Sequence, residues 1–227
     1  MKPKRPLLAG PDELLFELST LFAVDDDPWM RAMARDVATS VDLPVECYAN
    51  GEEFLAAYRP ERPGCVVLDV RMPGMSGLDV QRELLARRAR IPVIMITGYA
   101  DVTMAVEALR AGAVEFLEKP FSSQTLIERI QTAMHADRYR RHAAARFAAF
   151  TERVVRLTQR EREVLGLLVE GRPNKVIARQ LALSCKTVET HRAKLMNKTG
   201  VESLAELIRF GLQMRGGPVA EPVTADE

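Results

Sequence analysis

Five short apolar runs alternate with amphipathic segments between residues 21 and 134, and this alternation constrains the fold more than any other feature of the chain. The runs span residues 21–24, 45–48, 65–68, 91–96 and 114–117. Strand patterns that alternate with helical patterns are typical of βα units around a parallel sheet. Because each run is almost continuously apolar, we expect strands that are buried on both faces. The sequence therefore predicts an α/β fold with a doubly wound, five-stranded parallel sheet.

The segments between the runs have the periodicity of helices. They span residues 29–40, 52–58, 77–88 and 102–111, and a last one starts near 122. This last segment has no clear stop before about residue 153, and its second half is rich in Arg and Ala, which favour helix. We expect residues 135–152 to form a helical linker.

The remainder of the chain is helical in pattern throughout. Thr158 is a suitable N-cap, and Glu161 stands three residues later, where a capping box requires an acid. Further helices are expected over residues 174–183, from Ser184 to just before Gly200, and over 203–214. This pattern predicts an all-α domain of four helices that contains a helix-turn-helix.

These patterns divide the chain of 227 residues into five parts. We expect an N-terminal extension over residues 1–18, an α/β domain over 19–134, the linker over 135–152, a helical domain over 153–215 and a disordered tail over 216–227. The extension begins with basic and apolar residues, but its apolar run is too short for a signal peptide.

The charge of the chain is distributed unevenly. Residues 135–217 hold 17 Lys and Arg against 8 Asp and Glu, whereas residues 1–134 hold 15 against 20. This asymmetry indicates a nucleic-acid-binding module joined to one that handles metal or phosphate. The three cysteines form no C-x-x-C pair, which argues against a disulfide framework or a zinc site and suits the cytoplasm. No apolar stretch approaches the roughly 18 residues of a membrane span.

Reactive side chains stand at the ends of four of the predicted strands. Asp25 and Asp26 follow the first run, Asp69 the third and Thr97 the fourth, while Lys119 follows the fifth. The carboxyl ends of parallel strands meet at one edge of the sheet, so we expect these groups to converge. Clustered carboxylates repel one another unless a cation neutralises them, and Mg²⁺ prefers oxygen ligands.

The chemistry of this cluster follows from its groups. An ionised aspartate can accept a phosphoryl group as an acyl phosphate. We interpret Asp69 as the acceptor, Asp25 and Asp26 as metal ligands, and Thr97 and Lys119 as the groups that stabilise the phosphoryl oxygens. Gly98 leaves the approach to this cluster uncrowded.

Residues 21–134 resemble the receiver domain of two-component response regulators. The resemblance rests on Val-Asp-Asp-Asp-Pro at 24–28, Asp-Val-Arg-Met-Pro-Gly-Met-Ser-Gly at 69–77, Thr97-Gly98 and Leu-Glu-Lys-Pro-Phe at 117–121. It implies a flavodoxin-like fold, a metal ligand in the main-chain carbonyl of Arg71 and a cis peptide before Pro120. It also implies that Thr97 and Phe116 act as switch residues, and that residues 102–111 contribute to a dimerisation face.

The third helix of the C-terminal part, from residue 186 to about 198, has the composition of a recognition helix. It combines an apolar stripe with cations and hydroxyls on its other faces, which suits insertion into a major groove. Amphipathicity alone favours a small helical bundle whose charges only interact with solvent.

Residues 157–210 resemble the LuxR-type helix-turn-helix, which favours DNA binding over the plain bundle. The supporting residues include Leu-Thr-x-Arg-Glu-x-Glu-Val-Leu at 157–165, Asn-Lys-x-Ile-Ala at 174–178 and Thr-Val-x-x-His-Arg at 187–192. By this resemblance the contacts to the DNA backbone are Lys175, Lys186, Thr187, His191 and Lys198. The candidate base-facing residues are Glu189, Thr190 and Ala193. Arg192 suits either role, Glu189 would also repel phosphate, and the last helix serves either dimerisation or core packing.

Both resemblances together identify the chain as a NarL/FixJ-type regulator. They imply a transcription factor that a partner histidine kinase phosphorylates on Asp69 and that then forms a homodimer on promoter DNA. RNA polymerase is expected as a further partner, membranes are not, and chemistry is expected to be limited to its own phosphorylation and slow self-dephosphorylation.

Two rival interpretations remain. A metal-dependent aspartyl phosphatase commonly carries a second Asp two residues after its nucleophile, a position that Arg71 occupies here. The other rival is a receiver that acts through protein partners and has a vestigial DNA-binding domain.

Overall fold

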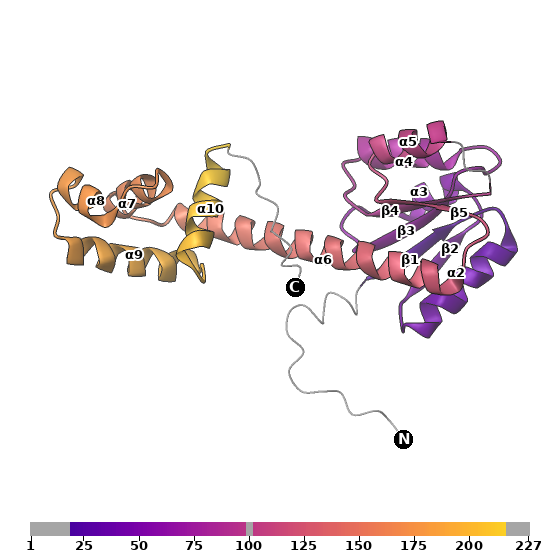
Figure 1. Ribbon diagram of the computed structural model, residues 1–227, viewed down its shortest axis with the longest axis horizontal. Coiled ribbons are helices and arrows are strands. Elements are labelled where there is room, and N and C mark those ends of the chain that lie inside the picture. Colours follow the sequence, from indigo (N-terminus) through magenta and orange to yellow (C-terminus); the bar gives the residue numbers. More distant parts are fainter. Residues whose placement is uncertain (1–18, 99–101, 217–227) are drawn as a thin grey trace, which may run out of the picture. The chain divides into compact units, whose positions relative to one another are not determined.

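The computed structural model describes residues 19–98 and 102–216 and divides the chain into two compact units, residues 1–141 and 142–227 (Figure 1). The predicted extension over residues 1–18 lies outside the described residues, as does the predicted tail from residue 217 onward. The division between the units falls inside one continuous helix, α6 (Ser123–Val154).

The first unit contains a five-stranded, all-parallel sheet, which confirms the predicted α/β class. The strand order is β2-β1-β3-β4-β5. The strands are β1 (Thr20–Val24), β2 (Val45–Tyr48), β3 (Gly64–Asp69), β4 (Val93–Thr97) and β5 (Glu115–Glu118). Every residue of β1, β3 and β4 is buried, as expected for strands covered on both faces.

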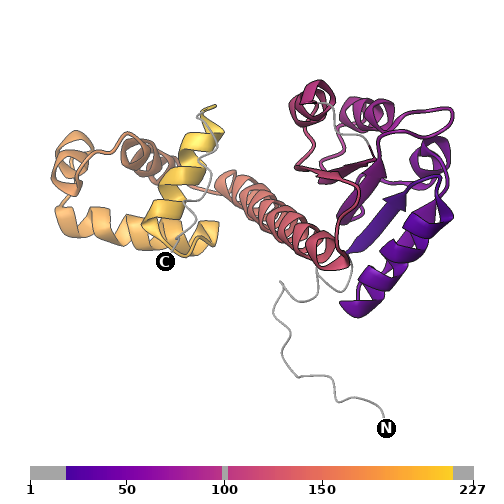
Figure 2. The same ribbon diagram turned by 45° about the vertical axis from the view of Figure 1, so that its right-hand side comes forward.

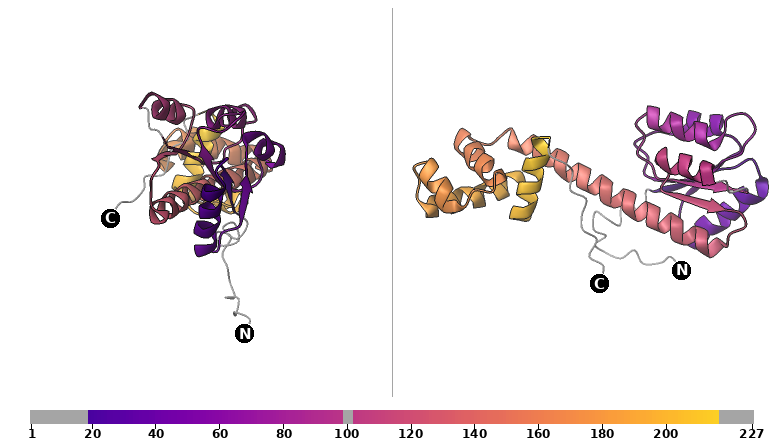
Figure 3. Two further views of the ribbon diagram at one scale, coloured as in Figure 1. Left: turned by 90° about the vertical axis from the view of Figure 1, so that its right-hand side faces the viewer. Right: turned by 45° about the horizontal axis from the view of Figure 1, so that its top comes forward.

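Helices cover both faces of this sheet (Figures 1 and 3). One face carries α3, α4 and α5, whose apolar side chains form a core with Phe22, Val66 and Met95. The other face carries α2 and the first part of α6 over Leu21, Val67 and Ile94. The bounds are α2 (Pro28–Ser40), α3 (Gly51–Ala57), α4 (Gly77–Ala86) and α5 (Val102–Arg110).

Local signals explain where α4 begins. Ser76 caps the helix and exchanges hydrogen bonds with Asp79 in a capping box. The preceding turn brings Gly77 so close to β3 that a Cβ atom there would lie 2.2 Å from the main-chain oxygen of Asp69. Glycine is therefore required where this turn passes the end of β3.

The second unit is all-helical. It comprises the end of α6 with α7 (Gln159–Val169), α8 (Asn174–Gln180), α9 (Cys185–Thr199) and α10 (Leu204–Met214), and Figure 2 shows the short turn from α8 to α9. These helices share a core that includes Phe150, Val164 and Leu195. The four-helix domain expected after residue 157 is confirmed, although side chains from the carboxyl end of α6 also contribute to its core.

The helix expected over residues 174–183 is shorter than predicted. α8 ends at Gln180, and Ala182 has a φ of 51°, in the left-handed region. Ser184 then accepts a hydrogen bond from the Thr187 N–H and caps α9, as predicted. Since Ala is not a usual residue for a left-handed turn, the sequence carried no signal for this stop.

Candidate functional site

The predicted acidic cluster lies at the carboxyl edge of the sheet. Asp69 is the last residue of β3, Thr97 is the last residue of β4, and Asp25 directly follows β1. All three side chains are buried, with exposed fractions of 5%, 1% and 6%. The fold therefore brings these three groups together in a site that is largely withdrawn from water.

Lys119 joins the two buried carboxylates. Its Nζ donates to Oδ1 of Asp69 at 2.7 Å and to Oδ2 of Asp25 at 3.0 Å. Charge-assisted hydrogen bonds of this kind are stronger than neutral ones. The ammonium thus balances part of the negative charge that the sheet edge concentrates. The peptide bond between Lys119 and Pro120 is cis, as the resemblance implied.

Backbone N–H groups hold the remaining carboxylate oxygens. The Arg71 N–H donates to Oδ2 of Asp69 at 2.7 Å, and the Asp27 N–H donates to Oδ1 of Asp25 at 2.8 Å. Each carboxylate therefore has one oxygen on Lys119 and the other on the loop that follows its own strand. This arrangement fixes the orientation of both groups before any ligand binds.

Burial also shifts the proton affinities at the site. Desolvation raises the pKa of Asp25, against the opposing effects of the Asp27 N–H and Lys119. Desolvation lowers the pKa of Lys119, but its hydrogen bonds to Asp69 and Asp25 outweigh this effect, so that the pKa is raised overall. Lys119 is consequently a permanent cation at neutral pH, beside a carboxylate that is costly to ionise.

The side chains present fit a magnesium ion. Mg²⁺ is commonly held by one or two carboxylates together with water and phosphate oxygens, and Asp25 and Asp69 supply two buried carboxylates from neighbouring strands. Within residues 19–98 and 102–216 no group of three or more His, Cys, Asp or Glu side chains is arranged to hold a metal. Asp26 is exposed next to the pair, so its role as a ligand stays a prediction, as does that of the Arg71 carbonyl.

The two predicted switch residues have different surroundings. Thr97 is buried at the end of β4, and a Cβ atom on the adjacent Gly98 would have no neighbour within 4 Å among residues 19–98 and 102–216. Phe116 in β5 is partly buried against the core that lies under α3, α4 and α5. An incompletely buried ring is compatible with the predicted switch, which stays a prediction.

In the second unit, α9 presents most of the predicted DNA contacts to solvent. Lys186, Glu189, Thr190 and Ala193 are exposed on α9, and Lys175 is exposed on α8. Thr187 and His191 are half-buried, and Nδ1 of His191 is buried with no hydrogen-bond partner in the described part of the chain.

Two other predicted contacts have partners within the protein. Arg192 donates to Oδ1 of Asn174 at 3.1 Å and so connects α9 to the first residue of α8. Nζ of Lys198 lies 2.7 Å from Oε1 of Glu161 in the first turn of α7. The sequence indicated Glu161 only as part of a capping box, which is present, and not as the partner of a lysine.

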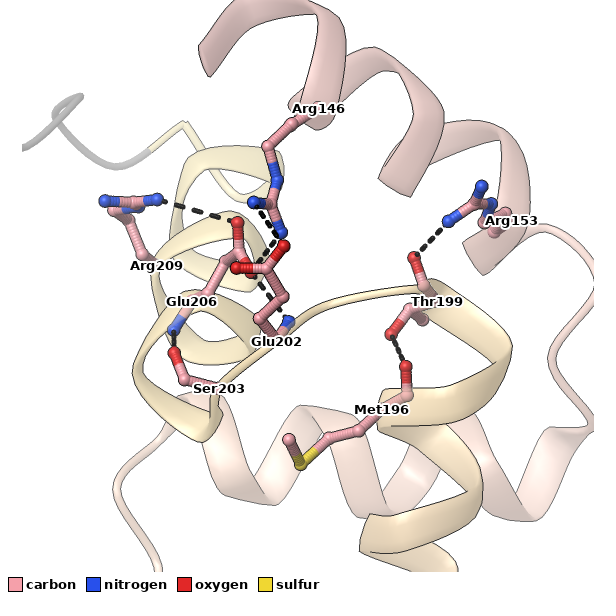
Figure 4. Close-up of polar contacts among 8 residues, drawn as sticks. All are labelled: Arg146, Arg153, Met196, Thr199, Glu202, Ser203, Glu206 and Arg209. Carbon is pink, nitrogen blue, oxygen red and sulfur yellow. Dashed lines mark hydrogen bonds and ion pairs between the residues drawn. The ribbon is translucent and has the colours of Figure 1, made fainter. Parts of the chain in front are cut away.

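The end of α6 also contacts α9, and no local sequence pattern predicts this contact. Arg153 donates to the main-chain oxygen of Thr199 at 3.2 Å, and Arg146 forms ion pairs with Glu202 and Glu206 at 2.9 and 2.8 Å (Figure 4). Arg146, which was expected to be part of the linker, thus contacts Glu206 in α10 and Glu202 just before it, whereas Arg153 belongs to the predicted helical domain.

Comparison with known families matches both units. Residues 21–131 match the response regulator receiver domain, and residues 155–210 match the bacterial regulatory proteins of the luxR family. The chain is a response regulator of the NarL/FixJ class.

The relatives of this response regulator are similar over most of their length. The transcriptional regulatory protein FixJ of Rhizobium meliloti is 40% identical over 205 residues, which cover 88% of this chain and 98% of FixJ. The response regulator protein TodT of Pseudomonas putida is 37% identical over 206 residues, or 91% of each chain. A structure of the response regulator StyR has a TM-score of 0.66 and 40% identity, and the match covers 86% of this chain and 98% of that one.

Membership of this family settles the general class of the molecule. The response regulator combines a receiver with a LuxR-type DNA-binding domain, and its family consists of transcriptional regulators, which are not typical enzymes. Receiver domains of this kind bind Mg²⁺ at the aspartate site. None of the helices in the described residues is both long and apolar enough to span a membrane.

Proposed function

We propose that a partner histidine kinase phosphorylates this response regulator on Asp69, and that phosphorylation promotes homodimerisation and promoter binding. The observation that carries the proposal is the placement of Asp69. Its carboxylate is buried at the sheet edge, with one oxygen on Lys119 and the other on the Arg71 N–H. A carboxylate held in this way is an oriented nucleophile beside a fixed positive charge.

The phosphoryl transfer is a displacement at phosphorus, in which one bond forms and another breaks. An oxygen of Asp69 forms a bond to the phosphorus of a phosphohistidine, the P–N bond breaks, and the imidazole leaves with its electron pair and takes up a proton. Lys119 stabilises the negative charge of the phosphoryl oxygens, and the Thr97 hydroxyl does so from β4. Bound Mg²⁺ supplies further charge neutralisation, and Asp25, Asp26, Asp69 and the Arg71 carbonyl would hold it.

On DNA, the two kinds of contact have different tasks. Lys175, Lys186, Thr187 and His191 are proposed to contact phosphates, which sets affinity, whereas exposed Glu189, Thr190 and Ala193 face the bases. Two half-sites read by a homodimer give more contacts than a monomer can make, so a modest gain in dimerisation raises occupancy strongly. RNA polymerase is the proposed downstream partner, and the cytoplasm is the proposed compartment.

A selection experiment tests this proposal. The protein is treated with acetyl phosphate and Mg²⁺ and used to select duplexes from a random pool of DNA. We expect a two-fold-related sequence, bound more tightly and as a dimer after treatment, and we expect Asp69→Ala to lose both responses to treatment. A failure to select any duplex would contradict the DNA-binding function, and equal responses of Asp69→Ala would contradict the role of Asp69.

A further inference from the structure

The last turn of α9 is attached to the first turn of α7 by one ion pair. Nζ of Lys198 lies 2.7 Å from Oε1 and 2.9 Å from Oε2 of Glu161, so the ammonium contacts both carboxylate oxygens. The two residues are 37 positions apart in the sequence. The pair therefore fixes the carboxyl end of the proposed recognition helix to the N-terminus of a different helix.

The side chain of Glu161 is held in place and cannot move with Lys198. Its side chain has an exposed fraction of only 4%, and its Oε2 also accepts from the Thr158 N–H at 2.9 Å in the capping box. The bond to Lys198, followed by that to the Thr158 N–H, lowers the pKa of Glu161 to about 2. A lysine that turned toward a DNA phosphate would leave a buried, ionised carboxylate without its counter-charge, which is strongly unfavourable.

The other lysines of α9 differ from Lys198. All three lysines are exposed, Lys198 with 46% of its side chain, but Lys186 and Lys194 have no ion-pair partner among the residues that the structure describes. Lys194 lines the same open pocket as Lys198, together with His191 and Thr158. Lysines without internal partners can give their charge to phosphate at little cost, whereas Lys198 first has to break its pair.

We propose that Lys198 and Glu161 are positioning residues, which set the angle of α9 against α7, and that Lys198 does not contact the DNA backbone. This inference rests on the proposed DNA-binding function and reassigns one of its expected contacts. The bond of Arg153 to the main-chain oxygen of Thr199 holds the same end of α9 (Figure 4). The carboxyl end of α9 is thus fixed within the protein, and the lysines of this helix that contact phosphate are Lys186 and Lys194.

The salt dependence of DNA binding separates a positioning lysine from a phosphate contact. Each phosphate contact contributes about 0.9 to the slope of log K against log salt concentration. With the duplex selected above, we expect Lys198→Met to bind more weakly than wild type with an unchanged slope. Lys194→Met is the matched control on the same helix, and we expect it to reduce the slope by about 0.9.

For Glu161→Gln, the direction of the change in DNA affinity distinguishes the two roles. Loss of an acid beside DNA strengthens binding if the acid acts only through its charge, because it removes repulsion of phosphate. If Glu161 acts by holding α9, the variant binds the selected duplex more weakly, and its melting temperature falls. The double variant Glu161→Gln/Lys198→Met removes both charges, and we expect it to be destabilised by less than the sum of the single effects.

These measurements distinguish the possible failures. If wild type selects no duplex, the proposed function fails, and the double-variant cycle in thermal unfolding still tests the pair. A slope reduced by about 0.9 in Lys198→Met overturns the positioning role, as does tighter DNA binding by Glu161→Gln. Should Lys198→Met not fold, the slope of the double variant decides the same question, because it too lacks the lysine.

Discussion

The ammonium of Lys119 lies 2.7 Å from Oδ1 of Asp69, although the two residues are 50 positions apart in the sequence. The proposed nucleophile therefore has a counter-charge in place before any phosphoryl group arrives. This hydrogen bond determines both the charge balance at the sheet edge and the orientation of the acceptor.

Replacement of Lys119 tests this relationship. We expect Lys119→Met to slow phosphorylation by acetyl phosphate about a hundredfold, since a fixed donor to the developing charge is lost. Phosphorylation rates from intact-protein mass spectrometry measure this effect. Lys175→Met, which removes an exposed lysine of the second unit, is the control and should leave the rate unchanged. A normal rate in Lys119→Met would contradict the role of this ammonium.

The stability of the receiver should depend on pH through Asp25. Because burial raises the pKa of Asp25 above 3.8, the native state binds a proton more tightly than the unfolded state does. The free energy of unfolding therefore falls as the pH rises from about 3.8 to the raised value. We expect Asp25→Asn to be more stable than wild type at neutral pH without Mg²⁺, and the difference to vanish below about pH 3.8.

Urea unfolding in the presence of a chelator measures this difference. Addition of Mg²⁺ is the matching control, since a ligand that binds only the native state stabilises it. Wild type should gain stability from Mg²⁺ and Asp25→Asn should gain much less. Equal stability of both proteins across the pH range would show that the ionised carboxylate carries no penalty.

The turn after β3 should tolerate no side chain at Gly77. We expect Gly77→Ala to lower the free energy of unfolding by about 1–3 kcal/mol, because its Cβ would lie 2.2 Å from a main-chain oxygen, which cannot move without disturbing Asp69. Gly98→Ala is the control at the same edge, where a Cβ has no neighbour within 4 Å in the part of the chain that the structure describes. Chemical denaturation compares the two, and similar stabilities would contradict the described turn.

The two ion pairs of Arg146 should differ in their contribution to stability. Glu206 has a side-chain exposure of 9% and Glu202 one of 80%, so only the pair with Glu206 is sheltered from water (Figure 4). We expect Arg146→Met to destabilise the second unit by about 2 kcal/mol, because the buried Glu206 carboxylate loses its nearest cation and keeps only the longer ion pair with Arg209 at 3.9 Å. Glu202→Gln should change stability by less than about 1 kcal/mol. Calorimetric melting of the full chain checks both, and equal effects would be contrary to this difference in burial.

The acidic site could be predicted largely from the sequence. Asp25, Asp69 and Thr97 each follow an apolar run, and the carboxyl ends of parallel strands necessarily meet at one edge. The pattern did not show that Lys119 donates to two carboxylates at once. That arrangement depends on side-chain reach across three strands, and strand periodicity carries no information about reach.

The second unit was less predictable in its contacts than in its helices. Thr158, Ser184 and Gly200 indicated the helix ends correctly, because capping is a local property of a few residues. The pairs of Lys198 with Glu161 and of Arg146 with Glu206 join residues far apart in the chain, and no local pattern indicates them. The same applies to the early end of α8, where Ala182 adopts a left-handed conformation that its residue type does not favour.

Chemical trapping of the acyl phosphate identifies the phosphorylated residue itself. Protein treated with acetyl phosphate and Mg²⁺ is reduced with borohydride, which converts an aspartyl phosphate to homoserine, and the modified peptide is sequenced by mass spectrometry. We expect homoserine at the position of Asp69, formed in the presence of Mg²⁺ and lost with a chelator. Modification at another carboxylate, or none at all in folded, Mg²⁺-treated protein, would contradict it.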